Sequence, residues 1–489
     1  MSFRSFLSGL FDKPASKSLS RAPDRVRAGY DAAQTNDENR RHWSMADAMS
    51  ADASGNPAVR RELRNRCRYE FANNGLAMGI VNTLSQHVVS GGPTLTCGNP
   101  AIEVKWAKYA KSIRLVDKLR LIRATRSLSG ETFNVRFINE RVEGPVKIDV
   151  RVYEPDHVSG DALYGNTFDS QFYYDGIQYD EDGNPQTYHI LPYHPGDVGY
   201  TSAKDAIPVN FRYVYHDFRR LRPGQRRGIP EISPSLPLFG YKRRWTLATV
   251  AASETAANLA VLLTTPAPVD PTADTEEMAP FQAVDFERNM ATSMPAGYSV
   301  NQLKPEQPTT NYEMFNSELT KEIARCVDMP YTVAALDSSK ANMSAMYGDW
   351  QTYNTVRIIP DQFELTDFLE WLYEAWIAES VLVGDIDESD VPDFHKFLWT
   401  GVGEHADPSK VAKANETDLA TGVTNLAKIY ARRGEDWEEQ QEIAARTFGI
   451  TVQKYREYLV QRTFSVPNTG QVAEPDQSES DDSKPIPKE

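Results

Sequence analysis

The stretch MPYTVAALDSSKANMSAMYGDWQTYNTVRIIPDQFELTDFLEWLYEAWIAESVLVG, from Met329 to Gly384, joins a short polar loop, residues 337–342, to a long helix rich in aromatic residues. Pro360 lies inside this helix and removes a backbone donor at a cost of roughly 3 kcal/mol, so a kink is expected there. The stretch predicts a small loop carried by a firmly anchored helix, without an evident catalytic group. The apolar residues with the spacing of one helical face are Met346, Trp350, Tyr353, Leu365, Phe368, Leu369, Leu372 and Trp376.

The composition sets broad limits on the function. The chain has 489 residues, of which 40% are hydrophobic, and a mean hydropathy of −0.52, as in a globular protein of about two to four domains. Its formal net charge of −15 argues against wrapping nucleic acid by neutralising phosphates, although DNA could pass through without being gripped. Three cysteines without metal-ligand spacing, Cys67, Cys97 and Cys326, indicate a reduced, cytosolic chain.

Both ends of the chain are expected to lie outside a folded core. Residues 1–55 have weak periodicity and predict a mobile arm without a signal peptide, whereas residues 465–489 predict a disordered tail. The segment from Trp245 to Thr265 is apolar enough to be considered as membrane-spanning. Glu254 and Asn258 at its centre would be costly in lipid, so no membrane association is expected.

One helix is predicted from Asn56 to Gly91-Gly92, with Pro57 in its first turn. Its first half carries five arginines. We interpret them as a helix face paired with carboxylates of the same chain, in preference to a nucleic-acid surface, because surface charges usually behave in this way. The five are Arg60, Arg61, Arg64, Arg66 and Arg68.

Residues 100–127 predict a further helix, and residues 130–220 predict an antiparallel α+β layer. The strand segments of this layer alternate apolar and polar positions. Asp182-Gly183-Asn184-Pro185 is a strong turn signal between two short strands. The segment VNFRYVYHDF, residues 209–218, predicts another strand.

A long helix is predicted from Leu236 to Leu263, after a loop rich in arginine, glycine and proline. Prolines and acids interrupt the pattern over residues 264–310. Helices are predicted again over residues 311–328 and 407–464, and a strand follows the opening helix within residues 346–406. A stripe of alanines on the first helix would suit close packing between neighbouring helices better than the core of a monomer. It comprises Ala248, Ala252, Ala256 and Ala260.

Catalytic motifs are absent from the sequence. It contains no phosphate-binding loop, dinucleotide fingerprint, HExxH, CxxC or GxSxG. His189 and His194 lie near Asp197, but the prolines around them favour an ordinary turn over a metal or acid–base site. The acidic run 180–182 lacks cation-loop spacing and is interpreted as a hairpin tip. Residues 337–340 lack the spacing of a Ser–Lys catalytic pair. Neither a metal nor a cofactor is predicted.

Four blocks of sequence occur in an order that is typical of one family. They are RRELRNRCRYEFANNGLAMGIVNTLSQHVVSGGPTL, DGIQYDEDGNPQTYHILPYHPGD, RRLRPGQRRGIPEISPSL and DSSKANMSAMYGDW. In this order they resemble the portal proteins of tailed bacteriophages, specifically the lambda-type portal family. The resemblance spans about residues 60–400. It departs from the family at Lys340-Ala341, where arginine and alanine are frequent.

The resemblance implies a mainly helical α+β portal fold that assembles into a ring of about twelve subunits. Its parts carry the names used for portals. They would be a wing (56–235), two stem helices (236–263 and 311–328), a clip (264–310), a tunnel loop (329–345), a spine helix of the wing with a return strand (346–406) and a helical crown (407–464).

The resemblance also implies roles for individual residues. The alanine stripe would pack stem helices around the ring. The kink expected at Pro360 from the proline itself would lie in the spine helix, where it would either flex or only bend the helix around the ring. Asp274, Glu276 and Glu277 would form a docking surface on the clip. Lys340 would be a sparse positive contact to DNA. The residues implied to line the DNA channel are Asp337, Ser338, Ser339, Lys340, Asn342 and Ser344.

The implied function is that of a non-enzymatic virion protein at one capsid vertex, assembled in the host cytoplasm, of a phage with a siphovirus-like tail. Double-stranded DNA would pass through it during packaging and ejection. Its partners would be further copies of the chain, terminase, a head–tail adaptor, and the major capsid and scaffolding proteins. Two alternatives stay open: a metal-dependent phage nucleic-acid-processing enzyme, which needs converging carboxylates, and a monomeric adaptor or scaffold.

Overall fold

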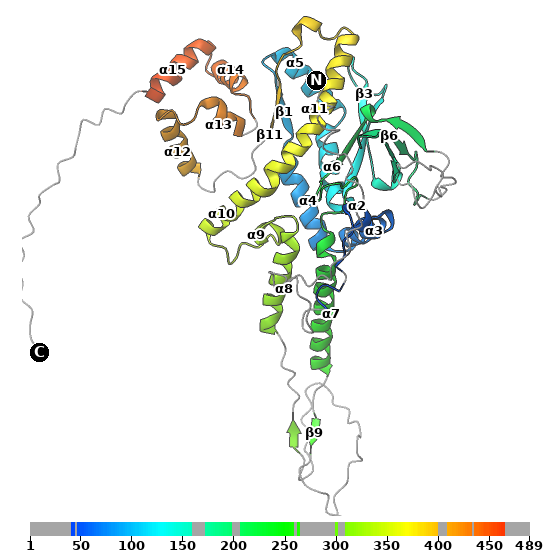
Figure 1. The fold of residues 1–489 in the computed structure, drawn as a ribbon. Helices are drawn as coiled ribbons and strands as arrows, with labels where there is room; N and C mark the ends of the chain where they lie inside the picture. The colour runs from blue at the N-terminus through cyan, green and yellow to red at the C-terminus, as the bar shows by residue number, and fades with distance from the viewer. Residues whose placement is uncertain are drawn as a thin grey trace, which may run out of the picture. The chain divides into compact units, whose positions relative to one another are not determined.

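The computed structural model describes residues 41–44, 46–158, 172–197, 206–258, 262–264, 299–301, 309–399, 408–432 and 435–464. The chain divides into two compact units, Met1–Ser50 and Ala51–Glu489, and the fold described below is that of the second. It combines helices with small antiparallel sheets (Figure 1), which confirms the predicted mainly helical α+β class.

The N-terminal helical region is more divided than the sequence predicted. The expected single helix is two helices, α3 (Pro57–Asn73) and α4 (Gly75–Val89). Asn74 ends the first, since its N–H bonds Glu70 O at 2.8 Å, and begins the second, since its side chain accepts from Leu76 N at 3.1 Å. A short helix α2 (Ala51–Ser54) also precedes the predicted end of the arm at residue 55.

The next predicted helix, over residues 100–127, is likewise two helices. They are α5 (Pro100–Ser112) and α6 (Leu115–Ser129). Asn99 caps the start of α5, and Arg114 between the helices has a left-handed conformation with φ 53°. That conformation is costly for a residue with a Cβ and interrupts a regular helix.

Two antiparallel sheets follow, as predicted for residues 130–220. Their inner faces enclose a small core that contains Phe133, Ile177 and Tyr188. The first sheet has the order β3-β2-β8 and the second β4-β5-β6-β7. The strands are β2 (Glu131–Ile138), β3 (Ile148–Tyr153), β4 (Tyr173–Tyr174), β5 (Ile177–Tyr179), β6 (Pro185–Ile190), β7 (Ile207–Asn210) and β8 (Val214–Phe218).

The single strand predicted over residues 209–218 was wrong. It is the end of β7 and all of β8, which belong to different sheets. A turn at Phe211–Tyr213 separates them, and the Asn210 side chain accepts from Arg212 N at 3.0 Å to start it. Asn and Asp favour such turns because they bond the backbone two residues ahead.

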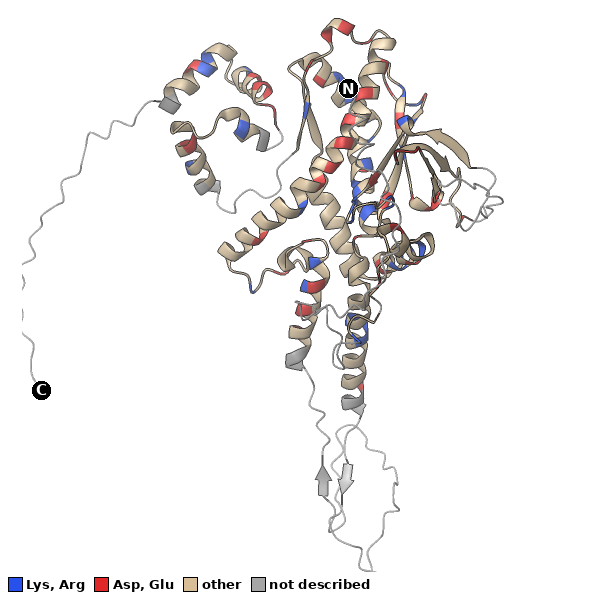
Figure 2. Ribbon diagram, viewed as in Figure 1, with Lys and Arg blue, Asp and Glu red and all other residues tan. Residues whose placement is uncertain are grey.

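The main core forms around α11 (Ile359–Leu382), which Figure 1 shows crossing beside α4 and α6. Trp376 of α11 stacks edge-on against Trp106 of α5, with ring centroids 5.2 Å apart. Strand β1 (Pro93–Thr96) pairs with β11 (Lys396–Trp399) next to this core. Figure 2 shows acidic positions along α11 and basic positions on the segments beside it.

Helices α7 (Leu236–Asn258) and α8 (Thr309–Arg325) lie side by side (Figure 1). The rings of Trp245 and Phe315 are 4.8 Å apart, and Lys242 Nζ donates to Thr320 Oγ1 at 2.7 Å. The expected end of the first helix at Leu263 was wrong. The strand β9 (Leu262–Thr264) pairs there with β10 (Ser299–Asn301), and the three predicted clip residues, Asp274, Glu276 and Glu277, lie outside the described residues.

Four short helices end the described chain, within the range 407–464 predicted to be helical. Asp436 caps one of them by accepting from Glu438 N at 2.9 Å and Glu439 N at 3.1 Å. The helices are α12 (Pro408–Ala420), α13 (Leu426–Arg432), α14 (Trp437–Thr447) and α15 (Val452–Phe464). The predicted tail, residues 465–489, lies outside the described part of the chain.

Candidate functional site

The loop between α9 (Tyr331–Ala334) and α10 (Met343–Tyr353) is exposed and organised by its own polar side chains. Asp337 Oδ1 accepts from Ser339 N at 3.0 Å and from Ser339 Oγ at 2.7 Å. Asn342 caps α10 by accepting from Ser344 N at 2.9 Å. The predicted channel residues are therefore gathered in one short, exposed segment.

Lys340 reaches back from this loop to the helix α8. Its ammonium group forms an ion pair with Glu313, and the two side chains are 78% and 72% exposed. Such an exposed pair contributes about 0–1 kcal/mol. A cavity of about 660 Å³ lies beneath the loop, and its walls include Glu313, Met314, Lys321, Tyr331, Met346 and Asp349. The loop itself supplies part of the lining of this cavity, through Asp337, Lys340, Ala341 and Asn342.

A π-helical turn, Asn354–Ile358, separates α10 from α11 and ends two residues before Pro360. In this turn the N–H of Ile359 bonds the carbonyl of Asn354, five residues back, rather than four. Pro360 lies in the first turn of α11, a position in which its missing N–H costs little. The long helix of the sequence is therefore two helices joined by a wider turn.

The predicted packing stripe of α7 lies on an exposed side of the helix where the structure describes it. Ala248 and Ala252 are exposed, as are the neighbouring Leu247 (63%) and Val250 (50%). For Ala256 the side chain, and for Ala260 the whole residue, lies outside the described part. The role of this stripe stays a prediction.

A buried ion cluster lies next to the π-turn. The Asp361 side chain has no exposed surface and is contacted by four guanidinium groups. The contacts are Arg123 Nε at 2.6 Å, Arg126 Nη2 at 2.8 Å, Arg219 Nη2 at 3.0 Å and Arg357 Nε at 3.1 Å. Glu231, in the segment that leads into α7, binds Arg123 at 2.9 Å and Arg357 at 2.5 Å. The cluster therefore joins α6, the π-turn and the start of α7.

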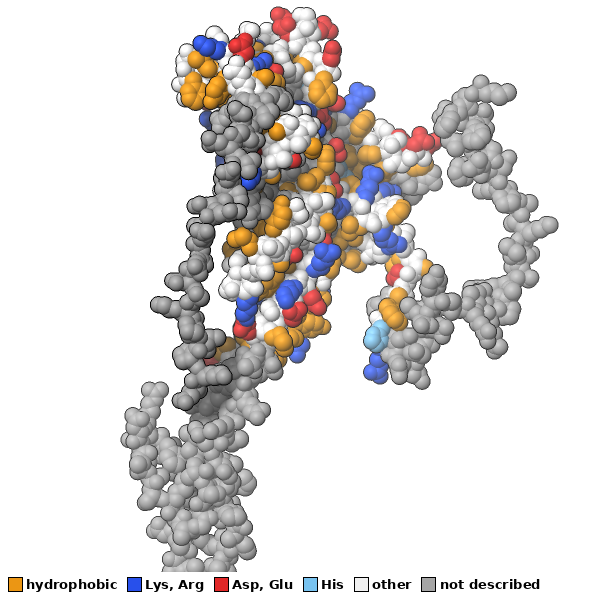
Figure 3. Space-filling view, turned by 90° about the vertical axis from the view of Figure 1, so that its left-hand side faces the viewer, with side chains coloured by type: hydrophobic (Ala, Val, Ile, Leu, Met, Phe, Trp, Pro, Cys, Tyr) orange, Lys and Arg blue, Asp and Glu red, His pale blue; other side chains and the backbone are white. Residues whose placement is uncertain are grey.

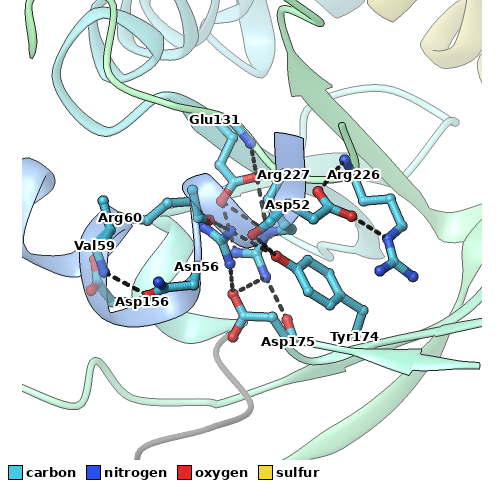
Figure 4. A network of polar contacts seen from close by, with 12 residues as sticks. Asp52, Asn56, Val59, Arg60, Glu131, Asp156, Tyr174, Asp175, Arg226 and Arg227 are labelled. Atoms are coloured by element: carbon cyan, nitrogen blue, oxygen red, sulfur yellow. Dashed lines mark hydrogen bonds and ion pairs between the residues drawn. The ribbon is translucent and has the colours of Figure 1, made fainter. Parts of the chain in front are cut away.

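A second buried cluster explains the Arg-Pro-Gly-Gln loop (Figure 4). Arg227 Nη2 lies 2.7 Å from Glu131 Oε1, and its Nη1 lies 2.8 Å from Asp175 Oδ2. Arg60 of α3 forms an ion pair with the same Asp175. Gln225 fixes the loop itself, because its Nε2 donates to the Arg227 carbonyl at 2.8 Å. The loop thus fastens α3 and the first β-sheet to the start of α7.

The arginines of α3 confirm the interpretation as intrachain pairs. Arg64 Nη2 lies 2.9 Å from Asp156 Oδ1, and Arg68 Nη2 lies 2.6 Å from Asp156 Oδ2. On the exposed side, Arg66 pairs with Glu62 at 2.8 Å.

These arginines also govern the buried carboxyl groups. Burial acts to raise the pKa of Glu131, but Arg227 and His216 hold it well below its ordinary value. Burial also acts to raise the pKa of Glu231. The neighbouring guanidinium groups, with Arg123 first among them, lower this pKa by more than burial raises it. Asp217 is the exception. Burial raises its pKa to about 6, because its closest cation, Arg126 Nη1, is 3.6 Å away.

Asp217 therefore makes stability depend on pH. Its folded pKa lies above its unfolded value, so the protonated form favours folding, and this contribution is lost as pH rises through about 6. We expect Asp217→Asn to increase the free energy of unfolding at pH 8 by roughly 1–3 kcal/mol, and so to raise the melting temperature there, and to have only a small effect near pH 4. Melting curves from pH 4 to 8, with the exposed Asp393→Asn as control, test this. A shift that is the same at every pH would contradict it.

Among the described residues, Glu154, Asp156 and His194 place one ligand atom each within 4.8 Å of one another. A guanidinium group already forms ion pairs with both carboxylates of this cluster, since Arg68 Nη2 is 2.6 Å from Asp156 and 3.3 Å from Glu154. The geometry thus fits an ion-pair cluster better than a metal site.

The remaining polar motifs are turns, as the sequence predicted. Asp197 Oδ2 accepts from His194 N at 3.2 Å. Asp180 Oδ1 accepts from Asp182 N at 3.0 Å and Asn184 N at 2.7 Å at the β5–β6 hairpin tip. In the part of the chain that the structure describes, no helix is both long and apolar enough to span a membrane.

Sequence reasoning missed both buried clusters. A signal was present: Arg123 and Arg126 occupy positions of α6 that continue the buried stripe of Leu119 and Ile122. A charge at a core position of a periodic helix indicates a buried partner, because an unpaired charge there is too costly. That signal does not say which carboxylate is the partner.

Comparison with known proteins identifies the family. The family described as phage portal protein, lambda family, matches residues 37–357, which is more than half of the chain. The chain therefore belongs to the lambda family of phage portal proteins. This agrees with the resemblance carried by the four sequence blocks.

Individual relatives are distant. The probable portal protein of Halomonas phage phiHAP-1 is 25% identical over 273 residues, which cover 53% of this chain and 52% of that protein. The chain thus spans about half the length of this curated relative. Among solved structures, a chain in the neck of an empty gene transfer agent particle has 12% identity and a TM-score of 0.49, over 75% of this chain and 92% of that one. A HK97 family phage portal protein from Corynebacterium diphtheriae has 12% identity and a TM-score of 0.30, over 71% and 96%.

Proposed function

We propose that this chain is the subunit of a non-enzymatic portal ring at one capsid vertex, through which double-stranded DNA is packaged and ejected. The family match over residues 37–357 carries the proposal, because it includes the paired helices α7 and α8 and the exposed loop after α9. In this proposal the chain is assembled in the host cytoplasm and resides in the virion. Terminase and then a head–tail adaptor bind the ring, which also contacts the capsid and scaffolding proteins.

The charge distribution supports passage of DNA over tight binding. The chain carries a net charge of −15, and Figure 3 shows acidic, basic and apolar side chains interspersed on the face drawn there. Tight, sequence-independent binding of DNA needs a basic surface that neutralises phosphates. A mixed, acidic wall would let a duplex slide instead.

Oligomeric mass is the direct test. Mass photometry of the purified full-length chain should give rings of about 0.66 MDa, the mass expected for about twelve 55.0 kDa subunits, and negative-stain images should show a central hole. A monomer that cleaves DNA in magnesium would contradict the proposal and favour the enzyme alternative.

Lys340 tests whether the loop meets DNA. We expect Lys340→Glu to leave the melting temperature unchanged, since its ion pair with Glu313 is exposed, and to lower packaged DNA about two- to threefold. The matched control is Lys413→Glu on α12, also exposed. The double variant Glu313→Lys/Lys340→Glu keeps the pair but moves the positive charge to α8. Unchanged packaging and retention with Lys340→Glu would count against a direct contact.

A further inference from the structure

The buried residues of α10 lie one position earlier in the chain than a continuous α-helix through α11 would place them. Counting back from the buried Leu365 in turns of about 3.6 residues places Asn354 on the same face of a continuous α-helix. The buried residue is instead Tyr353, which is 1% exposed. Two turns earlier, Met346 is half-buried where Tyr347 would be expected, and Tyr347 is 41% exposed.

The π-turn supplies the additional residue that brings these faces into line. It closes with the five-residue bond from Ile359 N–H to the Asn354 carbonyl. Pro360 lowers the cost of this arrangement, because it has no N–H to offer the carbonyl of Val356 in a regular α-helix.

Side chains hold the helix on both sides of the turn. After it, Asp361 is fixed by the arginines of α6, and within it Arg357 binds Glu231 and Asp361. Before it, Trp350 and Tyr353 pack on the ring of His87 in α4, with centroids 5.2 and 6.0 Å away. In a continuous α-helix the residues before the turn would be rotated by about 100° relative to those after it, so the additional residue lets both anchors form at once.

We propose that the π-turn is a positioning element that sets the direction in which α10 carries the loop 335–342, and that burial on its two sides, not Pro360, sets its register. That this loop faces DNA rests on the proposed function; the positioning itself does not. Removing one residue would turn α10 by about 100° and draw it in by about 1.5 Å. Lys340 would then leave Glu313.

Deletion of Val356 tests the proposal on the full-length chain. Val356 is 47% exposed, so its loss removes little core packing. A zero-length carbodiimide joins the Lys340 amine to the Glu313 carboxylate, and mass spectrometry measures the joined peptides. We expect their yield to fall at least tenfold in the deletion variant and to stay unchanged in Val356→Ala. The Lys105–Asp385 pair, 3.2 Å apart, provides the internal reference.

Pro360→Ala is the second variant. We expect it to keep the Lys340–Glu313 yield within twofold of the native chain, because the anchors remain. A folded deletion variant that keeps the crosslink, or a Pro360→Ala variant that loses it, would overturn the proposal. If the deletion variant does not fold, Pro360→Ala alone decides. The crosslink is read in each size fraction, so a chain that forms no ring but gives the expected yields would refute only the portal function.

Discussion

Asp361→Asn should destabilise the chain by roughly 3–5 kcal/mol, the usual cost of removing one partner from a buried ion pair. The substitution keeps the size of the side chain but removes the charge that four arginines share. An amide group cannot accept four guanidinium contacts, and its own N–H₂ would face cations. Because Arg123, Arg126 and Arg357 are buried, they cannot turn to water for compensation.

The measurement is thermal unfolding followed by tryptophan fluorescence, since α11 and its neighbours carry several buried or half-buried tryptophans. We expect the melting temperature to fall by at least about 5 °C. Asp367→Asn, the same change at an exposed position of α11, should shift stability by less than about 0.5 kcal/mol. Equal melting temperatures for the two variants would show that the cluster does not stabilise the fold.

Gly228→Ala should be comparably severe, because two backbone segments meet at this glycine. A Cβ at position 228 would lie 2.1 Å from the Gly130 carbonyl oxygen. This oxygen belongs to the backbone and cannot move aside as the end of a flexible side chain can. The amide of Gly228 also donates to Glu131 Oε2 at 2.8 Å, so a backbone shift would disturb the ion cluster. Overpacking of this kind destabilises a fold by about 1–3 kcal/mol or more, and loss of the hydrogen bond between Gly228 and Glu131 would add to this destabilisation.

Gly240→Ala provides the matched control for this variant. Gly240 lies in α7, and apart from its chain neighbours and the nearby backbone of the helix no atom lies within 4 Å of an added Cβ, so alanine should be neutral or stabilise the helix by about 0.5–1 kcal/mol. Soluble yield and melting temperature of the two variants should therefore change in opposite directions. A Gly228→Ala chain as stable as Gly240→Ala would mean that the Gly130 segment can move away at little cost.

Much of the local structure could be predicted because its causes lie within a few residues. The hairpin tip at residues 180–184 follows from an aspartate that bonds the backbone just ahead of it. The antiparallel strands follow from alternating burial. The ends of the elements were less predictable. Asn74 both ends α3 and begins α4, but the sequence does not distinguish an asparagine that interrupts a helix from one that lies within it.

The single apolar face predicted for the long helix was partly correct. Met346, Trp350 and Tyr353 do lie inward, and so do Leu365 and Trp376. They share a face, however, only because the π-turn adds a residue between Tyr353 and Leu365. The number of residues between Tyr353 and Leu365 can be read from the sequence. It does not decide between a helix whose apolar face rotates and a helix with a wider turn, because both are compatible with the same spacing.

The sequence by itself determined the mainly helical α+β class, the absence of catalytic motifs and the polar loop, since these depend on composition, local spacing and nearby caps. It also indicated the family, through the resemblance of four blocks in their order. Only the tertiary structure decided which charges meet. Arg123 and Arg126 bind Asp361 across 238 and 235 residues of chain, and Glu231 links both to the π-turn. Local propensity contains no information about such pairs, because burial creates the need for them and the packing of α6, α11 and the segment before α7 selects the partners.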